Sequence, residues 1–275
     1  MAAVIGGSGT FSFDFPGGIK RKDVEILDDN LIFSTPFGTA PPMVLFRFAN
    51  GRRVLCCRMH GWRPGVSRRA ASQQIFWVFR EAGVSAVLAE GGVGTVHLSS
   101  RPGDFIIPDD YIDWSCRRDT SLGDNYLLIM RDPLCPEIRA LLHRHALRQV
   151  PGGARVLDGG VYAVTDGRHF ESRAEVKALA SLGVDIIGQS LAPEVYLSRE
   201  IGACYAGIHQ VVNRAEGIGK DWSHDELKEL FLHRAGTVAG IMLDTALSLS
   251  EERKCGCSSL RKETLLKFPD HANPP

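Results

Sequence analysis

Two short segments near the N-terminus carry side chains that could bind an anion. Ser8 lies in Gly6–Gly9, where small residues let backbone N–H groups approach an anion and the hydroxyl adds a donor. Arg58 and His60 stand two residues apart at the end of an apolar segment that is predicted to be a strand. Residues i and i+2 of a strand share a face, so both side chains could point at one ligand. An arginine together with a histidine suits phosphate. A dinucleotide fingerprint would need a third glycine where Ser12 stands, so NAD binding is not predicted.

Aromatic and polar residues further along the chain could hold a heterocycle. Phe170, Glu171 and Asn213 come just past apolar segments. A ring, a carboxylate and an amide together suit a flat, hydrogen-bonding ligand. Each also has an ordinary structural interpretation, since a carboxylate stabilises a helix start and asparagine is common in turns.

The cysteines do not show the spacing of a metal site. The chain has seven, an odd number, with no CxxC pair. Cys255 and Cys257 form a CxC segment that could be a redox pair or two unrelated thiols. Scattered thiols favour a reducing cytoplasm.

Alternating apolar segments and helical patterns must position these residues. They predict a single α/β domain with a central mixed, mainly parallel β-sheet flanked by helices, over residues 1–250, followed by a C-terminal tail at 251–275. The expected strands are Ala2–Ile5, Pro42–Phe48, Arg53–Cys57, Ala86–Ala89, Asp104–Pro108, Val161–Thr165, Asp185–Ile187 and Cys204–Val212. The expected helices are Ser72–Ala82, Pro136–His145, Arg173–Ser181, Pro193–Ile201 and Ser223–Ser248.

Local signals add detail. Asn50-Gly51 predicts a hairpin, and Ser223 with Glu226 predicts a capping box. Ligands of such sheets gather at the carboxyl ends of strands, which directs attention to the turns at Gly6–Gly9, Arg58–Trp62, Glu90–Gly94 and Val212–Gly217. The aromatic residues Phe76, Trp77 and Phe79 on one helix suit either a subunit interface or the core.

Composition excludes several classes of partner. Lys+Arg and Asp+Glu are balanced at 32 each with a pI near 7.1, which argues against nucleic acid or an anionic membrane. No run approaches the ~20 apolar residues of a membrane span. The N-terminus has no basic segment followed by a long apolar one, so we expect a cytoplasmic protein.

Taken together, the motifs resemble the trimeric purine nucleoside phosphorylase and 5′-methylthioadenosine phosphorylase family, from about Ala2 to Ser248. Residues 183–195, GVDIIGQSLAPEV, are similar to the family's G-A-D-x-x-x-M-[ST]-x-x-P-E-[VA]. Residues 170–175, FESRAE, look like the F-E-T-x-A-E of the purine nucleoside branch, and residues 101–104, RPGD, match a further family segment.

The resemblance implies a phosphate shell and a substrate pocket. The phosphate shell would be Ser8, Arg58, His60, the backbone of Gly92, and Ser190. The substrate would meet Trp62, Tyr162 and Gln189 at the ribose, Phe170, Glu171 and Asn213 at the base, and His224 at the 5′-hydroxyl. Asn213, Glu171 and His60 would carry the chemistry.

The implied reaction is phosphorolysis of a purine nucleoside, with 6-oxopurines such as inosine or guanosine favoured. Phosphate is the co-substrate, no metal or organic cofactor is expected, and the family implies a homotrimer with active sites near subunit borders. The methylthioadenosine branch typically has Asp at Asn213 and an apolar residue at His224. The CxC tail, by contrast, resembles archaeal methylthioadenosine phosphorylases, so 5′-methylthioadenosine or 5′-methylthioinosine remains an alternative substrate.

Three departures from the family pattern leave other functions open. Gln189 replaces a methionine, and Gly167-Arg168-His169 replaces a Gly-Pro pair. Glu90 begins the segment that resembles N-A-A-G-G, where a carboxylate would repel phosphate unless it is turned away or paired with a cation. A nucleoside hydrolase with Glu90 as general base, and a non-catalytic purine-binding protein, are therefore alternatives.

Overall fold

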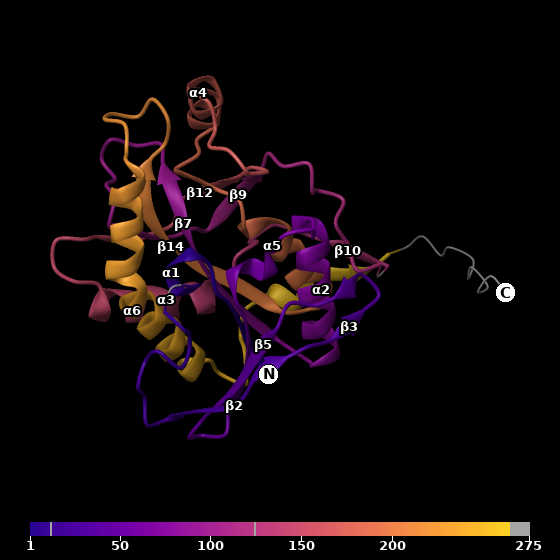
Figure 1. Cartoon of the computed structure of the whole chain (residues 1–275). Helices are drawn as coiled ribbons and strands as arrows, with labels where there is room; N and C mark the ends of the chain where they lie inside the picture. The colour runs from indigo at the N-terminus through magenta and orange to yellow at the C-terminus, as the bar shows by residue number, and fades with distance from the viewer. Residues whose placement is uncertain (12, 124, 265–275) are drawn as a thin grey trace.

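The computed structural model describes residues 1–11, 13–123 and 125–264, and within them a mixed sheet of eleven strands forms the centre (Figure 1). Its main path runs β11 (Val156–Asp158), β8 (Phe105–Ile107), β14 (Cys204–Arg214), β7 (Ala86–Thr95), β1 (Ala2–Ile5), β6 (Arg53–Cys57), β5 (Met43–Phe48) and β2 (Val24–Leu31). A branch leaves β7 through β13 (Ile186–Gly188), β12 (Val161–Val164) and β9 (Asp110–Asp113). The predicted α/β class with a central mixed sheet is confirmed.

Four neighbouring strands of this sheet run in the same direction. β1 pairs in parallel with β6 and β7, and β7 pairs in parallel with β14. Their carboxyl ends therefore meet at one edge, where parallel sheets gather ligands.

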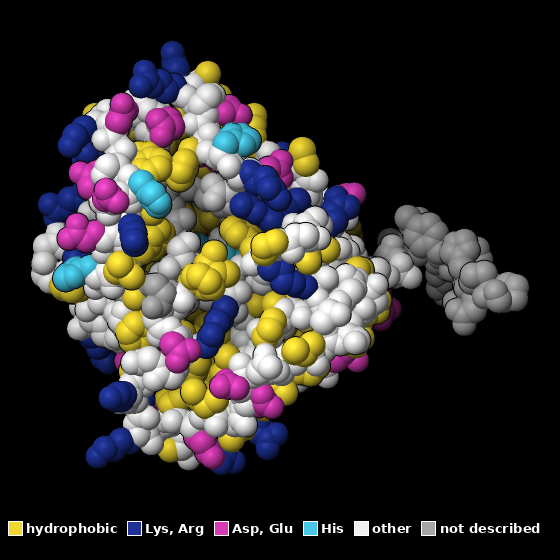
Figure 2. Space-filling model, in the orientation of Figure 1, with side chains coloured by type: hydrophobic (Ala, Val, Ile, Leu, Met, Phe, Trp, Pro, Cys, Tyr) yellow, Lys and Arg dark blue, Asp and Glu magenta, His cyan; other side chains and the backbone are white. Residues whose placement is uncertain are grey.

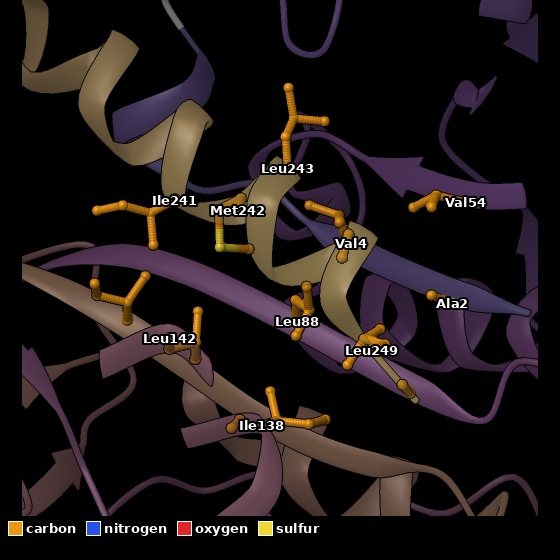
Figure 3. Packing of buried hydrophobic residues seen from close by; sticks show 14 of the residues in the cluster. Ala2, Val4, Val54, Leu88, Ile138, Leu142, Ile241, Met242, Leu243 and Leu249 are labelled. Atoms are coloured by element: carbon orange, nitrogen blue, oxygen red, sulfur yellow. The ribbon is translucent and has the colours of Figure 1, made fainter. Parts of the chain in front are cut away.

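Helices cover both faces of the sheet, because its central strands carry apolar side chains on both faces. α3 (Pro136–Gln149) and α6 (His224–Ser248) pack on the face that carries Ala2, Val4 and Leu88, as Figure 3 shows. α2 (Arg68–Glu81) and α5 (Leu191–Glu200) pack on the face that carries Ala3 and Ile5. Adjacent residues of β1 thus enter opposite layers of the core. α4 (Arg173–Ser181) packs beside β12 and β13.

Two local predictions are confirmed. The Ser223 side chain accepts from the Glu226 N–H while Glu226 accepts from the Ser223 N–H, so the capping box begins α6. β5 and β6 form an antiparallel hairpin with Phe46 opposite Val54, and Gly51 takes the positive φ of 85° that its turn needs.

Other boundaries differ from the expectation. β7 does not stop at Ala89: it continues through Glu90–Gly94 to Thr95, because β14 pairs with it along this whole stretch. Gly6–Gly9 is not only a tight turn, since Ser8 opens the short helix α1 (Ser8–Phe11). Phe76 and Phe79 of α2 are fully buried, so for these two aromatics the core interpretation is correct and the interface interpretation is wrong, whereas Trp77 is partly exposed.

Part of the predicted C-terminal tail packs on the same chain. η2 (Cys257–Leu260) follows α6, and β15 (Arg261–Glu263) pairs with β10 (Tyr126–Leu128). A second small pairing joins β3 (Ser34–Thr35) and β4 (Gly38–Thr39). The end of the tail at 268–275 lies outside the described residues.

Charged side chains of both signs are distributed over the surface. Figure 2 shows basic and acidic side chains intermixed over most of the visible face. Among the described residues, no helix is both long enough and apolar enough to cross a membrane.

Candidate active site

A pocket of about 240 Å³ lies at the carboxyl ends of the parallel strands. Its wall is formed by strand ends, by one face of α6, and by the turn from Gly6 to Phe11 that contains α1 (the α1 turn). Six residues that the sequence analysis singled out line it, namely Ser8, Gly92, Phe170, Glu171, Gln189 and Asn213. Segments more than 200 residues apart in the chain thus meet at one site.

Two buried polar side chains give the pocket its chemistry. Asn213 is 2% exposed at the end of β14; its amide nitrogen donates to the Arg214 carbonyl at 3.0 Å, and its Oδ1 has no partner among the described residues. Glu171 is 8% exposed and accepts from the Thr165 hydroxyl at 2.6 Å. A buried acceptor without a partner is costly, so Asn213 Oδ1 is poised for a ligand.

α6 closes one side of the pocket. Phe231 and Leu227 line it, and a Cβ at Gly92 would lie 2.6 Å from the Phe231 ring, so a larger residue there would displace that ring. His224 lies on the same helix face, at i, i+3 and i+7 with Leu227 and Phe231. It is exposed and is not on the pocket wall.

A buried hydrogen-bonded group lies behind the pocket. His60 Nδ1 is 2.7 Å from Glu194 Oε1, and the Tyr205 hydroxyl donates to Glu194 Oε2 at 2.8 Å. The Glu194 carboxylate therefore holds the His60 ring from one side. Its Nε2 faces the α1 turn, since a Cβ at Gly7 would lie 2.8 Å from that atom.

Ser190 and Tyr162 lie next to this group. The Tyr162 hydroxyl is 3.4 Å from Ser190 Oγ, and Tyr162 is fully buried rather than on the pocket wall. Burial raises the pKa of Tyr162 to about 12, so the phenol stays protonated. The side chain contacts Ser190 from inside the core instead of lining the pocket.

His209 is a buried histidine that the sequence analysis did not single out. Its ring lies edge-on to Tyr162 with centroids 4.9 Å apart, and neither ring nitrogen has a partner among the described residues. Gly91 separates it from Ser190: a Cβ there would lie 3.5 Å from both His209 Nδ1 and Ser190 Oγ. Burial, with a smaller effect from His60, lowers the pKa of His209 to about 3.

This depressed pKa predicts a pH-dependent stability. His209 is neutral in the fold at pH 5 but protonates on unfolding below its ordinary pKa of 6.5, so its contribution is complete above pH 6.5 and is lost as the pH falls toward 3. Between pH 7 and 5 the loss is about 2 kcal/mol. In urea unfolding, the free energy of unfolding of wild type should fall between pH 7 and pH 5 by about 2 kcal/mol more than that of His209→Gln.

The exposed His233 provides the matched control. His233→Gln should keep the wild-type pH slope. An unchanged slope in His209→Gln would mean that His209 is already protonated, or accessible to water, in the fold.

The expected pairing of Arg58 with His60 on one strand face is wrong. β6 ends at Cys57, and Met59 and His60 take positive φ of 49° and 52° in η1 (Met59–Gly61), so strand alternation does not continue. Arg58 instead points outward and donates to Asp14 at 2.7 Å. His60 alone turns into the protein.

Trp62 lies in a neighbouring cavity of about 890 Å³ rather than in the smaller pocket. Arg68 stacks over the Trp62 ring at 3.9 Å, and Arg117 and Arg168 line the same cavity. Burial and these two arginines lower the pKa of Arg68. The cavities adjoin at Gly167, which lines the larger one and lies against Gln189 of the smaller one.

Glu90 turns toward the α1 turn. Its Oε1 accepts from the Gly7 N–H, from the Thr10 N–H at 3.0 Å and from the Thr10 hydroxyl at 2.7 Å, and the residue is 1% exposed. The chain's own carboxylate therefore occupies amide groups that the sequence suggested for an external anion. Ser8 remains on the pocket wall.

Comparison with known proteins gives this site a context. The model of the phosphorylase superfamily matches residues 3–248, nearly all of the fold described above. The chain belongs to the phosphorylase superfamily. The predicted family is thereby confirmed.

Superfamily relatives span almost the whole chain. A probable 6-oxopurine nucleoside phosphorylase of Thermococcus kodakarensis is 30% identical over 94% of this chain and 97% of its own. A probable S-methyl-5′-thioinosine phosphorylase of Methanothermobacter thermautotrophicus is 31% identical over 94% of this chain and 87% of its own. The crystal structure of a methylthioadenosine phosphorylase from an antarctic soil metagenomic library shares the fold, with a TM-score of 0.80 at 24% identity over 94% of this chain and 90% of that one.

Sequence reasoning missed several residues of this superfamily member's site. Phe231 and Leu227 could have been found, because they follow His224 on one face of a predicted helix. Glu194 lies in the quoted PEV motif, but nothing in the sequence paired it with His60. His209 lies within an apolar strand, where a lone histidine gives no signal of its neighbours.

Proposed function

We propose that this phosphorylase superfamily member cleaves a 6-oxopurine nucleoside with phosphate, releasing the free purine and a pentose 1-phosphate. It would act as a pentosyltransferase. The observation that carries the proposal is the presence of two buried polar groups, Glu171 and Asn213, in the wall of one 240 Å³ pocket. The activities for which the relatives are named, on 6-oxopurine nucleosides and S-methyl-5′-thioinosine, agree with a purine substrate.

The base preference follows from hydrogen-bond complementarity. Glu171 would accept the N1–H of a 6-oxopurine, and Asn213 would donate through its amide nitrogen to N7 or O6 and so stabilise the negative charge that develops on the leaving purine. Adenine has no N1 proton, so its bare N1 would face a carboxylate. Such a mismatch costs on the order of 1–3 kcal/mol. Phe170 would pack on the base plane.

Phosphate would bind between Ser8, the backbone of Gly91 and Gly92, and Ser190, whose Oγ lies beside Gly91. Ser8 and the Gly92 backbone line the pocket, and the Nε2 of His60 faces the α1 turn. Arg58 would exchange Asp14 for phosphate. The C1′–N9 bond breaks as a phosphate oxygen bonds to C1′, and the phosphate charge stabilises the developing sugar cation.

His224 would select a polar 5′-group, because an imidazole facing a methylthio group loses its partner. His224→Val should therefore improve kcat/KM for methylthioinosine relative to inosine by about tenfold, equivalent to about 1.4 kcal/mol. The exposed His233→Val on the same helix is the control and should leave the ratio unchanged. An unchanged ratio in His224→Val would remove this residue from the 5′ side.

We also propose that the chain is a cytoplasmic homotrimer with pockets near subunit borders. Phe170, 49% exposed, and Trp222 stack edge-on at 4.7 Å beside the pocket, an apolar edge that suits a neighbouring subunit. Light scattering should give three times the 30.1 kDa chain mass. A monomer at micromolar concentration would contradict the assembly.

The substrate assignment is tested by comparing inosine, guanosine, adenosine and methylthioadenosine at saturating phosphate. Inosine or guanosine should have the highest kcat/KM. A value for methylthioadenosine at least tenfold above that for inosine, about 1.4 kcal/mol of transition-state discrimination, would assign the chain to the methylthio branch instead. Purine binding without turnover of any of the four would support a non-catalytic binding protein.

A further inference from the structure

Four cysteine thiols gather at the opposite end of the sheet from the pocket. Cys135 precedes α3, Cys204 opens β14, and Cys255 and Cys257 lie in the segment after α6. Their sulfur atoms all lie within 4.8 Å of one another, and three of the four residues are buried. None of the four is in a disulfide.

The sulfur spacing matches a tetrahedral metal centre. With Zn–S bonds of about 2.3 Å, sulfur atoms at the corners of a tetrahedron are about 3.8 Å apart. The Cys204 and Cys255 sulfur atoms are 3.4 Å apart, and no pair among the four thiols is more than 4.8 Å apart. One ion could therefore bond all four with small side-chain movements.

Hydrogen bonds hold the core side of the cluster in place. The Cys135 N–H donates to the Tyr205 carbonyl at 2.7 Å, and the Cys204 N–H donates to the Ser85 carbonyl at 3.0 Å. These bonds fix the start of α3 against the first residues of β14. Two of the thiols are thus positioned by the sheet itself.

The segment after α6 is fixed in the same way. Arg199 donates to the Cys257 carbonyl at 2.8 Å, and the Lys254 N–H donates to Glu137 at 2.7 Å. Arg253 donates to the Ser85 carbonyl that also receives the Cys204 N–H. The positive charge of Arg253 would offset the negative charge of a tetrathiolate centre.

We propose that Cys135, Cys204, Cys255 and Cys257 form a structural Zn²⁺ site. Four protein sulfur ligands leave no open position, which is the arrangement of structural rather than catalytic zinc. Binding replaces four S–H bonds with four Zn–S bonds and releases four protons, with no change of oxidation state.

The location agrees with a structural role. Cys204 lies at the amino end of β14 and Asn213 at its carboxyl end, about 30 Å away at the rise of an extended strand. The ion would join the segment after α6 to α3 and the sheet. It would thereby hold η2 and β15 against the core.

The test begins with the full chain, purified with reductant and without added metal. We expect about one zinc per chain by elemental analysis. Adding Co²⁺ to zinc-stripped protein should give the intense thiolate-to-cobalt charge-transfer band of a tetrahedral sulfur site. Cys257→Ser should lose both signals, whereas Cys116→Ser, a change at an exposed cysteine outside the cluster, should keep them.

Stability gives a second readout. A strong chelator should lower the Tm of wild type and of Cys116→Ser but not that of Cys257→Ser. If Cys257→Ser does not fold, the cobalt spectrum of wild type decides alone.

Two results would overturn the site. Absence of zinc and of a cobalt spectrum, with all seven thiols titrating in denaturant, would mean a cluster of free thiols. Absence of metal with fewer reactive thiols would mean that the cluster is built to form disulfides.

Discussion

Asn213→Asp is expected to lower kcat/KM for inosine by about 100-fold, equivalent to about 2.7 kcal/mol of transition-state stabilisation. A carboxylate at this 2% exposed position would face O6 and the negative charge that develops on the leaving purine. It could instead accept from the exocyclic amine of adenine. The ratio of adenosine to inosine turnover should therefore rise.

The control for this change is Asn50→Asp in the exposed β5–β6 turn. It makes the same chemical change far from the pocket and should leave both substrates unaffected. If Asn213→Asp kept the wild-type ratio, Asn213 would not read the 6-position of the base.

Glu90→Ala is expected to destabilise the fold by about 4 kcal/mol. The change removes the acceptor for the buried Gly7 and Thr10 N–H groups, and each buried donor left without a partner costs about 1–3 kcal/mol. The α1 turn should loosen, which would raise the KM for phosphate. Urea unfolding and phosphate titration measure the two effects.

Glu90→Gln separates this structural role from the alternative role as general base. Glutamine keeps a carbonyl acceptor for the turn, so we expect a smaller stability loss and substantial turnover. Glu229→Ala, at an exposed site on α6, is the control for removing a glutamate. Abolished turnover in a fully stable Glu90→Gln protein would favour the hydrolase.

The sequence predicted elements best where periodicity and capping agree. α4 has the predicted bounds, Arg173–Ser181, and β6 has the predicted Arg53–Cys57. β2 was missed: its eight residues, VEILDDNL, do not alternate regularly between polar and apolar, and most of them are exposed. β7 extends past its apolar segment because pairing with β14, rather than side-chain type, keeps Glu90–Gly94 extended.

The candidate site was predictable in part, because the order of strands and helices indicates where the ligand-binding edge of the sheet lies. Residues at or just past strand ends, such as Asn213 and Ser8, reach one pocket because parallel strands end at one edge. Arg58 is paired with Asp14 outside this pocket, and Trp62, which follows the left-handed residues of η1, lines the neighbouring cavity. The thiol cluster was not predicted, because its four cysteines come from three separate parts of the chain and no rule of sequence spacing connects them.

The most direct test of the proposed phosphorolysis is the phosphate dependence of inosine cleavage. We predict that hypoxanthine release requires phosphate, saturates with the phosphate concentration, and yields ribose 1-phosphate in equal amount. Release at the same rate in phosphate-free buffer, with free ribose as the sugar product, would contradict the proposal and identify water as the nucleophile.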